Sequence, residues 1–220
     1  MYTIYLHEPT TKVGYKINSF KTKFLNICNT HVQDERALAF AFILYDFENP
    51  EIAKILKDIE YWNCLNQVAG HYLTVFSILQ PLRTSPSNFN KNKDFDENLN
   101  NSNRIILSEY FHSEFDSKMP SILFFQVSKN QIIDSLLCQI TYTSVDDAFK
   151  EIKAILSTAV NSLKHVEPQY RNNSQEIFNL ITGGLSERRE KLLYIKSIKI
   201  LKSASEIIIL VSKIYQILAR

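Results

Sequence analysis

The chain has few of the residues that build phosphate-binding loops or disulfide frameworks. Only 4 of its 220 residues are glycine. They are Gly14, Gly70, Gly183 and Gly184, without the clustered spacing by which a Rossmann or P-loop motif holds phosphate. The three cysteines are an odd number at wide spacing, so they predict neither a disulfide framework nor the paired ligands of a zinc site.

The chain also lacks an excess of charge and a long apolar run towards its C-terminus. Its 25 basic and 23 acidic residues give a formal net charge of +2, which is too balanced to indicate that the whole chain binds nucleic acid or a membrane. The longest apolar run near the C-terminus is residues 207–211, whereas a membrane span needs ~20 residues. The first residues do not resemble a signal peptide. We therefore expect a cytoplasmic protein that does not enter a membrane.

What is present is ample apolar mass, with 45% hydrophobic and 12% aromatic residues. Two apolar runs, residues 37–47 and 71–79, predict strands that are buried on both faces. Between them, Asn49 and Pro50 are typical of a helix cap and a first helical position. The apolar spacing that follows predicts one helix as far as Gly70. This strand–helix–strand order predicts a right-handed parallel βαβ unit.

Local patterns also predict the remaining elements. We expect strands at 2–7, 121–127 and 132–142, and the last two should form an antiparallel hairpin. We also expect helices at 17–31, 105–111 and 144–163, with Ser144 as the cap of the last one. Residues 80–103 contain seven asparagines and predict a long surface insertion. Residues 175–220 predict helices, interrupted at Gly183 and Gly184.

The order of these elements resembles the thioredoxin fold, and residues 119–125 (MPSILFF) are the most specific part of the resemblance. In that family a proline, usually in a cis peptide bond, precedes the fourth strand, and Pro120 has this position here. Residues 44–47 are similar to the strand that leads into the family's active-site turn. The resemblance implies an α/β fold: a thioredoxin-like domain over residues 1–165, with a mixed sheet flanked by helices. An α-helical extension over residues 166–220 would follow it.

The chain departs from this family where the redox cysteines belong. The family uses two cysteines separated by two residues at a helix start, where the helix terminus lowers the thiol pKa. The corresponding residues 46–51 contain no cysteine. We expect Cys28, Cys64 and Cys138 to be buried apolar side chains. The resemblance therefore implies a redox-inactive domain without a cofactor.

The resemblance also implies a binding edge, where thioredoxin-like domains grip extended peptides. The residues of this predicted binding edge are Asp46, Phe47, Glu48, Asn49, Pro50, His112, Glu114, Asp116, Met119 and Pro120. An alternative use of its carboxylates and histidine is a divalent-metal site of a hydrolase or nuclease near Asp46 and His112. Acidic residues at a helix start are also what the helix dipole favours without any further function.

The C-terminal segment carries an apolar seam with alternating spacings of three and four residues. The residues of this C-terminal seam are Leu201, Ala204, Ile208, Val211, Tyr215 and Leu218. Such a seam fits another helix, whether from the same domain, a protein partner or a second copy of the chain. Residues 185–220 hold eight basic and three acidic residues, so a nucleic-acid adaptor is a third reading, although interleaved aromatics are lacking.

These observations favour a non-catalytic protein-interaction or scaffold subunit of a larger bacterial assembly. Its partner would bind at the predicted binding edge, at the C-terminal helices, or at both. We assign no catalytic residue, metal or cofactor. One form of such an assembly is a multi-gene defence system, although no residue points to it.

Overall fold

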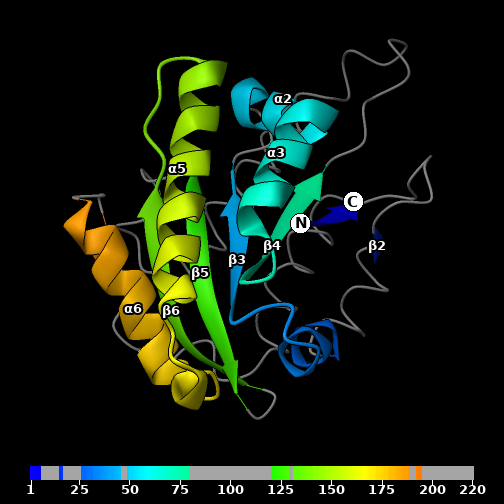
Figure 1. Ribbon diagram of the computed structural model, residues 1–220. Helices are drawn as coiled ribbons and strands as arrows, with labels where there is room; N and C mark the ends of the chain where they lie inside the picture. Colours follow the sequence, from blue (N-terminus) through cyan, green and yellow to red (C-terminus); the bar gives the residue numbers. More distant parts are fainter. Residues whose placement is uncertain are drawn as a thin grey trace.

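The computed structural model describes residues 1–5, 15–16, 26–45, 49–79, 120–128, 131–188 and 192–194. The strands are β1 (Tyr2–Tyr5), β2 (Tyr15–Lys16), β3 (Ala39–Leu44), β4 (Leu73–Leu79), β5 (Ser121–Ser128), β6 (Gln131–Gln139) and β7 (Leu192–Tyr194). The helices are α2 (Pro50–Lys57), α3 (Ile59–Ala69), α5 (Val145–Lys164), the short 3-10 helix η2 (Pro168–Tyr170) and α6 (Ser174–Glu187), with a further helical segment at residues 26–33. The protein is therefore mixed α/β, as its sequence predicts (Figure 1).

The strands form one mixed sheet in the order β2-β1-β4-β3-β5-β6-β7. Strands β2, β1, β4 and β3 are parallel, and β5, β6 and β7 join by antiparallel pairing. The expected parallel βαβ unit is confirmed, because β3 and β4 pair in parallel across α2 and α3. The expected hairpin is confirmed as β5–β6.

Helices α2, α3, α5 and α6 lie on one face of the sheet (Figure 1). Alternate strand residues such as Ala41, Val75 and Phe124 pack there against Ile155 of α5 and Ile181 of α6, and all of them are fully buried. Helix α6 thus shares one core with α5 and the sheet. The division of the chain near residue 165 stays a prediction.

The opposite face of the sheet is lined with phenylalanines. Phe40 of β3 pairs with Phe125 of β5, and Phe42 pairs with Phe76 of β4, so all four side chains point to this face. Their rings lie close together, with centroids 5.5 Å apart for Phe40–Phe125 and 5.1 Å for Phe42–Phe76. Strand β3 is therefore buried on both faces, as predicted from its continuous apolar run.

The predicted single helix between Pro50 and Gly70 is in fact two helices. Asp58 stands between them with an extended backbone (φ −76°, ψ 124°). Its backbone N–H donates a hydrogen bond to the Lys54 carbonyl, which ends α2, and the same residue is the N-cap of α3. Its carboxylate accepts the backbone N–H of Glu60 at 2.9 Å and of Tyr61 at 3.3 Å. The prediction was wrong because aspartate is a strong helix cap, and here capping outweighs the continuity of the apolar spacing. The break leaves Ile59 66% exposed.

The segment after residue 175 differs from its prediction in two places. Helix α6 continues through Gly183 and Gly184, where we expected an interruption. Residues 192–194, which we expected to be helical, form β7 and pair with residues 136–138 of β6. A three-residue apolar run does not distinguish helix from strand, and here the neighbouring strand decides. The insertion at 80–103, the helix at 105–111 and residues 195–220 lie outside the described residues.

Candidate interaction surface

Of the predicted binding edge, Asn49, Pro50 and Pro120 are described. Leu44, the last residue of β3, pairs with Ser121, so Pro120 lies at the sheet end from which the chain leads into Asn49 and α2. The Pro120 carbonyl accepts the Ile140 N–H at 2.8 Å. The other edge residues lie outside the described part of the chain: Asp46, Phe47, Glu48, His112, Glu114, Asp116 and Met119.

Asn49 has a local role at this end of the sheet. Its side-chain oxygen accepts the Ile52 N–H at 3.1 Å, which caps α2 as the sequence predicts. Its amide nitrogen donates to the Tyr142 hydroxyl, which stands between β6 and α5. The Asn49 side chain therefore joins the starts of α2 and α5, and both of its polar atoms are occupied.

Helices α3 and α5 also begin at this end and meet through an aromatic pair. The rings of Tyr61 and Phe149 have centroids 4.5 Å apart. The Tyr61 hydroxyl donates to Asp146 at 2.8 Å, and Lys153 Nζ lies 5.9 Å from the centre of the Phe149 ring. Together with exposed Ile59, which begins α3, we call these residues (Ile59, Tyr61, Asp146, Phe149 and Lys153) the helix-start surface.

Asp147, which follows Asp146 in α5, has a carboxylate that is held in its charged form. The hydroxyls of Thr143 and Ser144 donate to Asp147 at 2.6 Å and 2.9 Å, and these bonds lower the pKa of its carboxyl. The hydrogen bond to Asp146 raises the pKa of the Tyr61 phenol. These acidic groups serve helix starts, which is where the dipole favours them. Neither shift produces an acid or base that titrates near neutral pH.

The described residues do not assemble a metal centre, and two of the three cysteines are buried. No three histidine, cysteine, aspartate or glutamate side chains within them come together as metal ligands. Cys28 and Cys138 are buried, as expected, and burial raises the pKa of the Cys28 thiol. Cys64 is only partly buried, which corrects the expectation for that residue. The metal site near Asp46 and His112 stays a prediction, since both residues lie outside the described part.

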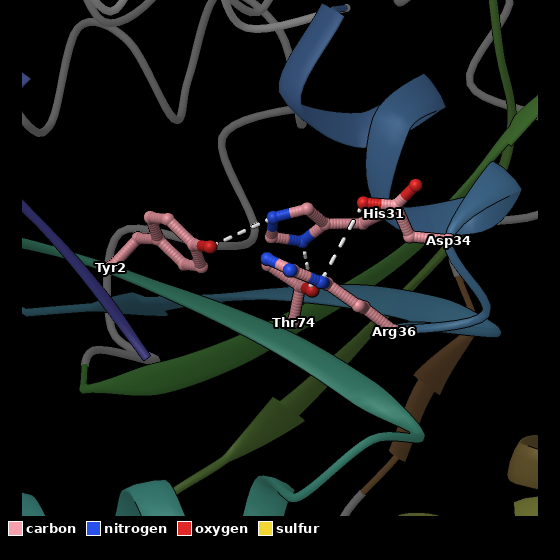
Figure 2. Close-up of polar contacts among 5 residues, drawn as sticks. All are labelled: Tyr2, His31, Asp34, Arg36 and Thr74. Atoms are coloured by element: carbon pink, nitrogen blue, oxygen red, sulfur yellow. Dashed lines mark hydrogen bonds and ion pairs between the residues drawn. The ribbon is translucent and has the colours of Figure 1, made fainter.

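A buried histidine, His31, was not among the residues that the sequence singled out. Figure 2 shows His31 between two hydroxyls: Nε2 lies 2.8 Å from the Tyr2 hydroxyl, and Nδ1 lies 2.7 Å from Thr74 Oγ1. Burial lowers the pKa of His31; the positive charge of Arg36 lowers it further, and Asp34 acts in the opposite direction. The neutral ring can donate to one hydroxyl and accept from the other.

The His31 cluster has a structural role. Only 6% of His31 is exposed, so a substrate has little access to the ring, while its two bonds tie the helix at 26–33 to β1 and β4. The partners are separated by 29 and 43 residues, and no local pattern links residues so far apart. The only signal was that Tyr2 and Thr74 stand in predicted strands.

The comparison with known proteins finds no match. No family model matches it, and no curated protein or solved structure is significantly similar. Across the described ranges, no helix has both the length and the apolar character needed to span a bilayer. The C-terminal seam lies entirely outside those ranges.

Proposed function

We propose that this chain is a non-catalytic protein-interaction or scaffold subunit of a larger bacterial assembly, built on a redox-inactive thioredoxin-like domain. The partner binds at the helix-start surface, at the sheet end where Asn49 and Pro120 lie. The proposal places the protein in the cytoplasm and gives it no cofactor.

The observation that carries this proposal is the exposure of Ile59. A 66% exposed isoleucine stands at the start of α3, two residues before the Tyr61–Phe149 pair. Aromatic side chains with a polar tip are enriched at protein interfaces, and they carry much of the binding energy there. An exposed apolar side chain and an aromatic pair thus stand at the start of α3, on different sides of that helix, which suits a partner chain better than a small substrate.

The arrangement of the elements supports the thioredoxin-like part of the proposal. The parallel β3–β4 unit, the β5–β6 hairpin and helix α5 follow one another in the order that the resemblance implies. Pro120 stands directly before β5, the strand that corresponds to the family's fourth. The redox-inactive part rests on residues 49–51, which begin α2 without a cysteine.

The proposal is tested by affinity purification of the tagged chain from the cells that encode it. Ile59→Asp places a charge in the surface, and an acidic residue at a helix start does not weaken the helix. The matched control is Asn63→Asp, one turn further along α3 at an exposed position. We expect the wild type and Asn63→Asp to retain the same protein, and Ile59→Asp to lose it at an unchanged unfolding temperature. Equal retention by all three, or retention of no protein by the wild type, would overturn the proposal.

A further inference from the structure

Asp58 separates α2 from α3 in a stretch of sequence that would also support one helix (Figure 1). Residues 51–69 contain neither glycine nor proline, so the bonds of Asp58 account for the break. Its carboxylate accepts the N–H groups of Glu60 at 2.9 Å and of Tyr61 at 3.3 Å. In one continuous helix those two N–H groups would bond to the carbonyls four residues before them. The carboxylate and the last carbonyls of α2 are therefore alternative acceptors for the same two donors.

The break also decides where the Ile59 side chain lies. The buried residues of α2 are Ile52, Ile55 and Leu56. Ile59 follows them by seven, four and three residues, and residues at these spacings share one face of a helix. In a continuous helix Ile59 would therefore extend the buried face of α2. Because the helix is broken, Ile59 begins α3 instead and is 66% exposed.

Different contacts stabilise the two arrangements. The broken helix has the Asp58 cap and the contacts of α3 with α5, where the rings of Tyr61 and Phe149 have centroids 4.5 Å apart. The continuous helix would replace these with unbroken backbone hydrogen bonds and with the burial of Ile59. An element in which two packings of one sequence compete responds to a ligand that binds only one of them.

We propose that the α2–α3 junction is a two-state switch that controls partner binding at the helix-start surface. In the broken state, which is the one described above, the Asp58 cap leaves Ile59 exposed to the partner. In the continuous state Ile59 turns onto the buried face of α2, and the partner loses its apolar contact. The partner binds the broken state alone and therefore shifts the junction towards it. This inference rests on the proposed function for the surface that is bound, whereas the two states exist without a partner.

The first test follows the two states in the purified full chain. Ile59→Cys supplies a thiol at the junction, and mass spectrometry measures its rate of alkylation with Asp58 retained and in Asp58→Asn and Asp58→Ala. Asparagine caps a helix as well as aspartate does, whereas alanine removes both acceptors and is the best helix former. We expect Asp58→Ala to slow alkylation of position 59 towards the rate of buried Cys138, and Asp58→Asn to leave it unchanged. An unchanged or faster rate in a folded Asp58→Ala variant would overturn the proposal.

Two further variants separate this effect from a general loss of stability. Asn173 caps α6 by accepting the Glu176 N–H at 3.2 Å, so Asn173→Ala removes a cap without touching the junction. It should leave alkylation of position 59 unchanged, and slowing equal to that of Asp58→Ala would overturn the proposal. If Asp58→Ala does not fold, Asp58→Gln takes its place, because glutamine forms helices well and is not among the preferred caps.

The second test measures the consequence for binding, in the affinity purification that tests the proposed function. Asp58→Ala should retain less of the partner than the wild type although it keeps Ile59, and Asp58→Asn should retain as much. If Asp58→Ala slows alkylation and still retains the partner fully, the junction does not control binding, and this proposal fails while the proposed function stands. If the wild type retains no protein, the proposed function and the control of binding fail together, and the alkylation rates alone decide whether the junction has two states.

Discussion

Two adjacent glycines in α6 should respond to alanine in opposite directions. A Cβ added at Gly183 would have no atom within 4 Å, whereas one added at Gly184 would lie 2.1 Å from Ser162 Oγ of α5. That hydroxyl donates to the Thr158 carbonyl at 3.1 Å. Gly184 is therefore the point of close approach between the two helices, and Gly183 faces solvent.

The expected magnitudes follow from two effects. In a helix interior, alanine is favoured over glycine by about 1 kcal/mol, so Gly183→Ala should raise the free energy of unfolding by about that amount. Gly184→Ala gains the same helix propensity but overpacks the contact with Ser162, which typically costs about 1–3 kcal/mol. It should therefore lower stability, or at best leave it unchanged. For a chain of this length, 1 kcal/mol corresponds to a change of about 2–4 °C in melting temperature.

Thermal unfolding of wild type, the two single variants and Gly184→Ala with Ser162→Ala checks this reasoning. Removing the Ser162 hydroxyl relieves the clash, since the Ser162 Cβ lies 3.4 Å from the added carbon. The double variant should thus melt at or above the wild-type temperature. If Gly184→Ala alone raised the melting temperature as much as Gly183→Ala does, α5 and α6 would not pack at this register and the reasoning would be refuted.

Three further predictions concern the caps, the buried histidine and the thiols. The free energy of unfolding should fall as the pH drops below about 6.5, because the folded pKa of His31 is below its ordinary value and the unfolded chain binds the extra proton. Denaturant titrations from pH 7 to 5 should show a shallower fall for His31→Gln than for the wild type, and an equal fall would contradict this. Asn49→Ala should cost about 0.5–2 kcal/mol through loss of the α2 cap, and denaturant unfolding at the wild-type midpoint would refute that role. In the native protein iodoacetamide should alkylate Cys64 before Cys28 and Cys138, which are buried; mass spectrometry would contradict this if all three reacted together.

Local sequence signals predicted those parts of the fold that depend on local physics. The continuous apolar run gave β3 its burial on both faces, and Asn49 and Ser144 cap α2 and α5 as expected. Each of these features depends on residues within a few positions of one another. Periodicity and capping are strong over that range, so such elements can be read without tertiary information.

The features that the sequence did not predict depend on competition or on distant contacts. At Asp58 the apolar spacing favours one continuous helix, but the capping side chain divides it into α2 and α3. Strand β7 forms because β6 supplies its hydrogen-bonding partners. A glycine fits at position 184 within α6 because α5 approaches the helix closely there. The Tyr61–Phe149 pair and the His31 cluster join residues from separate elements. Single residues of each stood in the expected strands and helices, but nothing in the sequence paired them.

The central claim, that a partner protein binds where α3 and α5 begin, is tested most directly by photo-crosslinking. A photoreactive phenylalanine derivative would replace Ile59 in the full chain, and Asn179, an exposed residue of α6, in a control. On illumination in the cells that encode the protein, we predict one reproducible protein adduct from position 59 and none from position 179. Identical adducts from both positions, or none from position 59, would contradict the account.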